Sequence, residues 1–142
     1  MTLNVCLAGA TGWAGSELAR GLAVADGLKL VSAVSRKHAG ATLVQALGDE
    51  RLDAPVFATA AEALSKPVDV FMEYTRPDSA KANILVALEH GAHVVVGTSG
   101  LSDEDYARID EAARAKGRAV LACGNFALTM VLLQKFAEQA LH

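Results

Sequence analysis

Apolar runs alternate with segments of helical periodicity along the whole chain. The first apolar run covers residues 3–8, and a helix-like segment, 16–22, follows it after a short glycine-rich stretch. Only the stretch through 36–53 is less regular. Later apolar runs lie at 28–35, 56–57, 68–74, 94–96 and 119–122. Because strands that alternate with helices are typical of a parallel sheet covered by helices, the pattern predicts an α/β fold with about six short strands in a doubly wound sheet.

Polar residues mark the starts of several predicted helices. Thr59 and Glu62 have the spacing of a capping box, in which a hydroxyl and a carboxylate each bind a free backbone N–H. Further helices are predicted over about 78–90 and from 102 to 116, the second ending at Gly117. These signals place most of the turns between elements.

The last predicted helix, 129–142, is strongly apolar and has few charges to solvate an outer face. Its apolar residues are Met130, Val131, Leu132, Leu133, Phe136, Ala137, Ala140 and Leu141. Such a helix needs a partner surface. It either covers the sheet of its own domain or docks on another domain or subunit, and the sequence leaves both open.

A glycine-rich loop joins the first predicted strand to the first predicted helix. It consists of Gly9, Ala10, Thr11, Gly12, Trp13, Ala14 and Gly15. Glycines permit a sharp turn and a close approach to a pyrophosphate, whose charge is attracted by the free N–H groups and the dipole of the helix start. Because the loop follows a strand and opens a helix, we interpret it as the phosphate cradle of a Rossmann-like NAD(P)-binding domain. The alternative is a strand-to-helix turn that needs flexible residues.

The loop after the second predicted strand begins with Ser35 and Arg36, followed by Lys37 and His38. Proteins that prefer NAD usually carry an acidic residue here, which binds the ribose 2′-hydroxyl. Ser35 is neutral, and the guanidinium of Arg36 suits a 2′-phosphate because it pairs with phosphate oxygens in bidentate fashion. The loop therefore favours NADP(H) over NAD(H), with a solvated surface cluster as the alternative.

Three later loops also follow predicted strands, where ligands of doubly wound sheets bind. The candidate residues are Tyr74 and Thr75 in the first loop, Gly97, Thr98 and Ser99 in the second, and Cys123, Gly124, Asn125 and Phe126 in the third. The first two loops offer hydroxyls and backbone groups to a nicotinamide carboxamide or a ribose. The third offers an amide and a flat apolar ring, which a turn entering a helix explains nearly as well.

Composition and charge exclude several classes of partner. Of the 142 residues, 52% are hydrophobic and 20% charged, and the net charge is −3 with both signs interspersed, so no basic stripe for nucleic acid is present. No apolar run approaches the roughly 18 residues of a membrane span and no leader opens the chain, so we expect a cytoplasmic location. The two cysteines and four histidines lack metal-ligand spacing, and we expect buried thiols and no metal.

Taken together, these segments resemble the amino-terminal domain of the 4-hydroxy-tetrahydrodipicolinate reductase family, also called dihydrodipicolinate reductases. The resemblance is carried by the glycine loop 9–15, the turn 74–78, the Gly-Thr-Ser-Gly loop 97–100, and Asn125-Phe126 before the final helix. The family more often has Gly-Thr-Thr-Gly in the third of these segments. The resemblance covers essentially the whole chain.

The resemblance implies an oxidoreductase in which NAD(P)H delivers hydride to a cyclic imine-type substrate on the diaminopimelate route to lysine. It implies ribose or 2′-phosphate contacts from Ser35 and Arg36, and nicotinamide contacts from the three later loops. Family members continue into a second domain that binds the small-molecule substrate and builds a tetramer. Because no residue here matches the proton donor or the carboxylate clamp of that domain, we name no catalytic residue. We expect 1–142 to be one dinucleotide-binding domain, with 125–142 as hinge and connecting helix, and nearly inactive alone.

Two alternatives stay open. A stand-alone NADP(H)-binding sensor or interaction module would present the final helix to a partner, and a homo-oligomer could form through the same helix. The cofactor domain of a semialdehyde dehydrogenase or acyl-phosphate reductase has a similar glycine loop. Those enzymes need a nucleophilic cysteine in a second domain, and Cys123 lies in a different context.

Overall fold

The computed structural model describes residues 1–123 and 128–140, and within them six parallel strands form one sheet. The strands are β1 (Leu3–Ala8), β2 (Leu28–Val34), β3 (Val56–Phe57), β4 (Val70–Glu73), β5 (His93–Val96) and β6 (Val120–Ala122). Their order across the sheet is β3-β2-β1-β4-β5-β6. This order confirms the predicted doubly wound, Rossmann-like fold, with β1 and β4 as neighbours at its centre.

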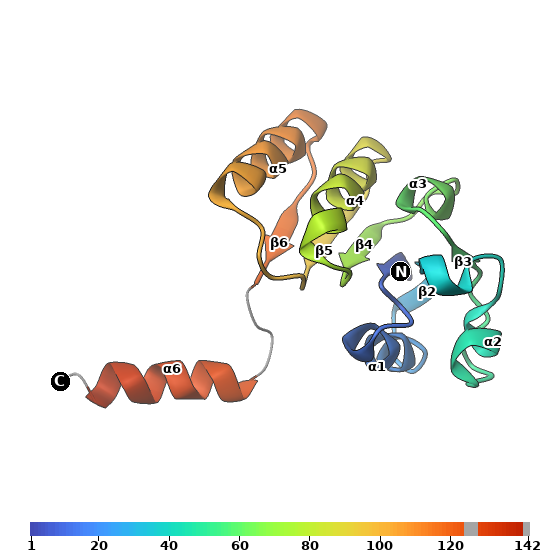
Figure 1. The fold of residues 1–142 in the computed structure, drawn as a ribbon, viewed down its shortest axis with the longest axis horizontal. Coiled ribbons are helices and arrows are strands. Elements are labelled where there is room, and N and C mark those ends of the chain that lie inside the picture. Colours follow the sequence, from blue (N-terminus) through green and yellow to red (C-terminus); the bar gives the residue numbers. More distant parts are fainter. Residues whose placement is uncertain (124–127, 141–142) are drawn as a thin grey trace.

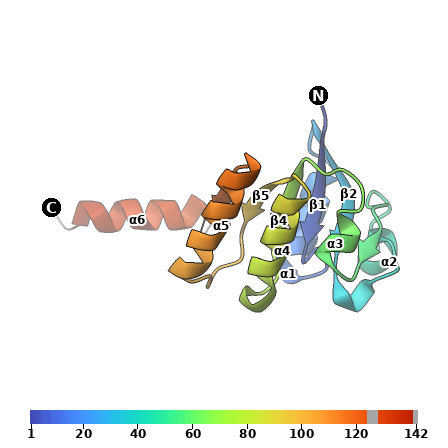
Figure 2. The same ribbon diagram turned by 90° about the horizontal axis from the view of Figure 1, so that it is seen from above.

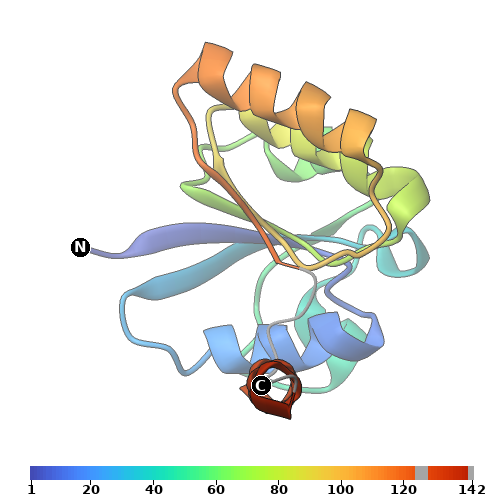
Figure 3. The same cartoon turned by 90° about the vertical axis from the view of Figure 1, so that its left-hand side faces the viewer.

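Helices cover both faces of the sheet, as Figures 1 and 3 show. One face carries α1 (Trp13–Leu22) and α2 (Leu43–Leu47), and the other carries α3 (Ala60–Ala63), α4 (Pro77–Glu89) and α5 (Asp103–Lys116). Because side chains alternate along a strand, β1 supplies Val5 and Leu7 to the first hydrophobic layer and Cys6 and Ala8 to the second. The core is therefore two layers divided by the central strands.

Local hydrogen bonds confirm the predicted helix starts. The Thr59 hydroxyl accepts the N–H of Glu62 at 3.3 Å, and the Glu62 carboxylate accepts the N–H of Thr59 at 3.0 Å. Ser102 and Asp105 make the same pair of bonds at the start of α5. Gly117 follows α5 with a φ of +61°, which is typical of a glycine that ends a helix.

The stretch that looks irregular in the sequence contains two short elements. A 3₁₀ turn, η1 (Arg36–His38), follows β2, and α2 begins with a further capping box between Thr42 and Gln45. α2 has five residues, which is too short for hydrophobic periodicity to separate it from a loop. The capping spacing of Thr42 and Gln45 was the available signal.

The last helix, α6 (Leu128–Ala140), extends away from the sheet and from α1–α5 (Figures 1 and 2). Its apolar side chains at 130–133 and Phe136 are 45–63% exposed. The helix therefore does not cover the sheet of its own domain. Within the described residues, no helix has the length and apolar character that crossing a bilayer requires.

Candidate functional site

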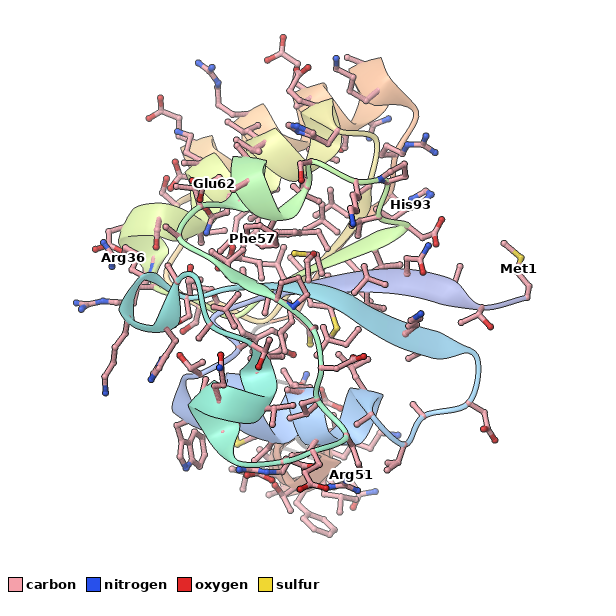
Figure 4. All side chains as sticks on the ribbon, turned by 90° about the vertical axis from the view of Figure 1, so that its right-hand side faces the viewer. Met1, Arg36, Arg51, Phe57, Glu62 and His93 are labelled. Atoms are coloured by element: carbon pink, nitrogen blue, oxygen red, sulfur yellow. The ribbon has the colours of Figure 1, made fainter. Side chains whose placement is uncertain are left out.

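The loops that the sequence singles out meet at one end of the sheet. β1, β2, β4 and β5 are parallel, so their carboxyl ends lie at the same end. The chain leaves β1 toward β2 on one side and reaches β4 on the other, which makes the β1–β4 boundary the switch point where doubly wound sheets bind ligands. Figure 4 shows Arg36, which follows β2, at the opposite end of the molecule from Met1 and His93.

Two glycines of the β1–α1 loop are required by close backbone contacts. A Cβ atom at Gly9, whose φ is +81°, would lie 2.2 Å from the carbonyl oxygen of Tyr74. A Cβ atom at Gly15 would lie 2.0 Å from the carbonyl oxygen of Gly9. Gly12 is less constrained, because its Cβ would lie 3.2 Å from the Gly9 oxygen, to which its own N–H donates at 2.9 Å. Gly9 and Gly15 therefore allow the loop to pack against α1 and the β4–α4 turn.

The backbone at the start of α1 is open to an anion. Gly12 is the N-cap residue and has no side chain to accept the first N–H groups, and the first turn contains no acidic residue. Within residues 1–123 and 128–140, the N–H groups of Trp13 and Ala14 have no hydrogen-bond acceptor. These donors and the positive end of the helix dipole suit a phosphate. The Trp13 ring is 94% exposed beside them.

A hydrogen bond joins the glycine loop to the loop after β2. The hydroxyl oxygens of Thr11 and Ser35 lie 2.6 Å apart, and the N–H of Ser35 donates to the carbonyl of Phe57 at 2.9 Å. The turn η1 then exposes Arg36 and Lys37, and neither has an ion-pair partner in the part of the chain that the structure describes. Both cations are therefore available to an anionic ligand.

Two depressions lie side by side over these loops. The first, of about 430 Å³, is lined by residues that include Gly9, Ser35, Arg36, Lys37, Thr75, Arg76, Ser79 and Asn83. The second, of about 250 Å³, is lined by Ala14, Tyr74, Thr75, Arg76, Pro77, Gly97, Thr98 and Ser99. Thr75 and Arg76 belong to both, so the depressions adjoin in one cleft that crosses the switch point.

The ring of Tyr74 explains the glycine that follows β5. A Cβ atom at Gly97 would lie 2.2 Å from a ring carbon of Tyr74. Burial raises the pKa of the Tyr74 phenol, and the Coulombic effect of Cys123 adds to that rise. The phenol is therefore neutral at physiological pH, and its ring forms a wall of the second depression.

A buried carboxylate connects the two loops that share this cleft. Glu73, at the end of β4, is fully buried, and its Oε1 accepts the N–H of Thr75 at 2.7 Å and also the Thr75 hydroxyl. Its Oε2 accepts the amide of Asn83 at 3.0 Å, and the Thr98 hydroxyl lies 3.4 Å from Oε1. Burial raises the pKa of Glu73, and the donors oppose that rise. The hydroxyls predicted to face a ligand thus donate inward, toward Glu73.

The remaining predicted residues follow β6. Cys123 is half-buried, donates its N–H to the carbonyl of Val96 at 3.3 Å and contributes to the raised pKa of Tyr74, whereas Gly124, Asn125 and Phe126 lie outside the described residues. Cys6 is fully buried in β1, and burial raises the pKa of its thiol to about 12, which makes it unreactive as a nucleophile. Among the described residues, no group of three potential metal ligands is present.

Sequence reasoning missed Glu73, Arg76, Ser79 and Asn83. For Glu73 the signal was a lone carboxylate at the end of an apolar strand. Ser79 and Asn83 have i, i+4 spacing at the start of α4, so they share the helix face that lines the first depression. Arg76 directly follows the residues that were identified.

The family comparison matches most of the chain. A family model described as dihydrodipicolinate reductase, N-terminus, matches residues 3–126. The 4-hydroxy-tetrahydrodipicolinate reductase of Halalkalibacterium halodurans is 37% identical over 139 residues, which cover 97% of this chain and 53% of that protein. The protein of the same name from Geobacillus kaustophilus is 32% identical over 142 residues, covering 99% and 53%. The chain thus spans about half the length of these curated relatives.

Solved structures share the fold. Dipicolinate-bound dihydrodipicolinate reductase from Paenisporosarcina sp. TG-14 has a TM-score of 0.81 and 25% identity, over 99% of this chain and 54% of that one. Biliverdin reductase from Synechocystis sp. PCC 6803, solved with biliverdin and NADP⁺, has a TM-score of 0.69 and 21% identity, over 84% of this chain and 37% of that one. The second likeness shows the fold alone.

Proposed function

The chain belongs to the dihydrodipicolinate reductase family, and from that membership we propose that it is the nicotinamide dinucleotide-binding domain of such a reductase. The observation that carries the proposal is the β1–α1 loop. There Gly9 and Gly15 have no Cβ atom to collide with neighbouring backbone, and the N–H groups of Trp13 and Ala14 are open to an anion at the switch point of the sheet. This donor set fits a pyrophosphate.

The proposed cofactor lies along the cleft, with its pyrophosphate at residues 9–15. The adenosine ribose and its 2′-phosphate occupy the first depression, beside Ser35 and Arg36. The nicotinamide end occupies the second, where Tyr74 and Thr75 meet the loop 97–99. We propose that residues 123–126 also contact the nicotinamide end of the cofactor. When bound, NAD(P)H supplies a hydride, and the residues of this chain hold and orient it.

Arg36 supports a preference for NADP(H) over NAD(H). Its guanidinium is exposed beside Ser35 and has no ion-pair partner within the described residues, so a 2′-phosphate would meet an uncommitted cation. The curated relatives do not decide this preference. It depends on the residues of η1 and the end of β2.

The test is a titration of the purified chain with NADPH and NADH, followed by the fluorescence of Trp13, the single tryptophan of the chain. Arg36→Ala is expected to raise the dissociation constant for NADPH about tenfold, the effect of one lost hydrogen bond to a charged group, and to leave NADH binding unchanged. Arg51→Ala is the matched control, because Arg51 pairs with Asp49 and lies away from Arg36 (Figure 4). Failure of the wild-type chain to bind either nucleotide at millimolar concentration would refute the proposal.

The proposed reaction of the whole reductase is reduction of a cyclic dihydrodipicolinate-type substrate by NAD(P)H, in diaminopimelate and lysine biosynthesis. We assign no catalytic side chain within residues 1–142, and we propose that substrate binding needs a further domain, with 125–142 as hinge and connecting helix. Without that domain the rate advantage of orienting the two reactants is lost. The purified chain should therefore bind cofactor and turn over little substrate, and a normal turnover rate would contradict this.

The exposed helix α6 supports a second candidate function, that of an NADP(H)-binding module that docks on a partner or on a second copy of this chain. Its apolar residues at 130–133 and Phe136 are 45–63% exposed, and solvent-exposed apolar surface of this kind favours association. Size-exclusion chromatography distinguishes the candidates. A module should form a defined complex, whereas a domain without its second half should be monomeric or aggregate.

A further inference from the structure

Glu73 is a buried carboxylate that the cofactor contacts proposed above leave without a role. It ends β4 at the centre of the sheet, paired in register with Ala8 of β1 and Val96 of β5, and its exposure is 0%. No ion pair to Glu73 exists among the described residues. A buried carboxylate without a cation is costly, so hydrogen-bond donors must satisfy it.

The donors to Glu73 come from two loops of the cleft and from α4. Thr75 in the β4–α4 turn gives its N–H, at 2.7 Å, and its hydroxyl to Oε1. The amide of Asn83 donates to Oε2 at 3.0 Å. The Thr98 hydroxyl, in the loop after β5, lies 3.4 Å from both Oε1 and the main-chain carbonyl of Glu73. One carboxylate thus ties the β4–α4 turn to the loop after β5.

This arrangement decides what the two threonine hydroxyls can offer to a ligand. Oε1 of Glu73 accepts the Thr75 N–H and so serves as an acceptor, and each hydroxyl directs its single hydrogen toward Glu73, to Oε1 or, for Thr98, to the main-chain carbonyl. The lone pairs of Thr98, and those of Thr75 that the Ser79 hydroxyl at 3.2 Å does not occupy, are left for the cleft. A hydroxyl that acts solely as an acceptor selects ligand groups that donate, such as a primary amide or a sugar hydroxyl.

We propose that Glu73 is a positioning residue, which fixes Thr75 and Thr98 as hydrogen-bond acceptors for the carboxamide and ribose donors of the nicotinamide half of the cofactor. The inference rests on the proposed function, and it adds that the hydroxyls of the site accept hydrogen bonds which the ligand donates. Of the partners of Glu73, Thr98 lines only the second depression, Thr75 borders both and Asn83 the first. The proposed adenosine contacts come from Ser35 and Arg36, which line only the first, so Glu73 should act chiefly on the nicotinamide half of the ligand.

The test compares binding of NADPH with binding of adenosine 2′-phosphate 5′-diphosphate, which has the same adenosine half and pyrophosphate and lacks both the nicotinamide and its ribose, by isothermal titration calorimetry on chain 1–142. Glu73→Leu removes both carboxylate oxygens, leaves the main-chain carbonyl near Thr98, and is expected to weaken NADPH binding about tenfold, with the fragment unchanged. Glu73→Gln keeps one acceptor oxygen for Thr75 and Thr98, and Asn83 can turn its amide to pair with the new NH₂ group. This conservative variant should restore most of the affinity.

Thr98→Val is the second variant, because it removes one hydroxyl while Glu73 stays in place and the shape is retained. It should weaken NADPH binding severalfold, and adding Glu73→Leu should then cost less than it does in the wild-type chain. Equal weakening of NADPH and the fragment would show a merely structural role and overturn the inference, as would unchanged NADPH binding in all variants. If the wild-type chain binds the fragment normally and NADPH no more tightly, only this inference fails. If it binds neither, the proposed function fails as well.

Discussion

A pair of glycine substitutions in α1 tests whether the glycine loop is shaped by backbone contact or by flexibility. Gly15 and Gly21 both lie within α1, Gly15 buried near its start and Gly21 exposed near its end. A Cβ atom at Gly15 would lie 2.0 Å from the carbonyl oxygen of Gly9 and 3.1 Å from the Cα of Ala10. A Cβ atom at Gly21 would meet no described atom within 4 Å. An alanine at Gly15 would therefore collide with backbone, whereas an alanine at Gly21 would point into open space.

The two substitutions are expected to change the free energy of unfolding in opposite directions. Alanine in place of glycine within a helix stabilises by roughly 0.5–1 kcal/mol, because glycine loses more backbone freedom on folding. Overpacking a filled site costs roughly 1–3 kcal/mol, and the contact at Gly15 is with backbone, which no rotamer change can relieve. Gly15→Ala should lower the free energy of unfolding by about 2 kcal/mol, whereas Gly21→Ala should raise it by about 0.5 kcal/mol.

Thermal unfolding followed by circular dichroism measures both effects. For a chain of this size each kcal/mol corresponds to roughly 2–4 °C, so Gly15→Ala should melt about 4–8 °C lower and Gly21→Ala slightly higher than wild type. Gly15→Ala should also lose NADPH binding, because the Gly9 carbonyl and the N–H groups at the helix start must move apart. A Gly15→Ala variant as stable as Gly21→Ala, with unchanged nucleotide affinity, would refute the contact argument.

Two further predictions concern charge and association. The Lys81 ammonium and the Ser102 N–H hold the pKa of Asp105 at about 2, so the stability that this carboxylate contributes is present above its unfolded pKa, about 4, and is lost as the pH falls toward 2. Asp105→Asn should therefore lower the melting temperature at pH 7 and reduce the further loss between pH 4 and pH 2, whereas Asp110→Asn, in an exposed pair with Arg114, should change neither. Replacing Leu133 and Phe136 with Gln should convert any self-complex formed through α6 to monomer in sedimentation velocity, with Gln134→Glu as the control. A wild-type chain that is monomeric at every concentration would exclude self-association through α6.

Much of the fold could be predicted because its signals are local. The capping spacing of Thr59 with Glu62, and Gly117 after a helical run, depend on hydrogen bonds within a few residues, and both are confirmed. The alternation of strands and helices predicted the doubly wound sheet for the same reason. The glycine loop could be predicted from its place between β1 and α1, a context that is itself local.

The parts of the site that sequence reasoning missed depend on contacts between distant residues. The bond between Thr11 and Ser35 joins positions 24 residues apart, and Thr98 approaches Glu73 across 25. The sequence shows that a loop contains a hydroxyl, but whether that hydroxyl faces the cleft or the core depends on tertiary packing. The tertiary fold turns Thr75 and Thr98 inward because a buried carboxylate must be satisfied there.

Because Cys6 is buried, the rate at which its thiol is modified can report how often the protein unfolds. The thiol lies in β1 with 0% exposure, so an alkylating reagent can reach it only while the core is open. In a Cys123→Ser background the chain would carry a single thiol. Its modification rate, followed by mass spectrometry under native conditions, would then report how often the central sheet opens, and the slowing caused by an added nucleotide would give the binding energy without denaturant.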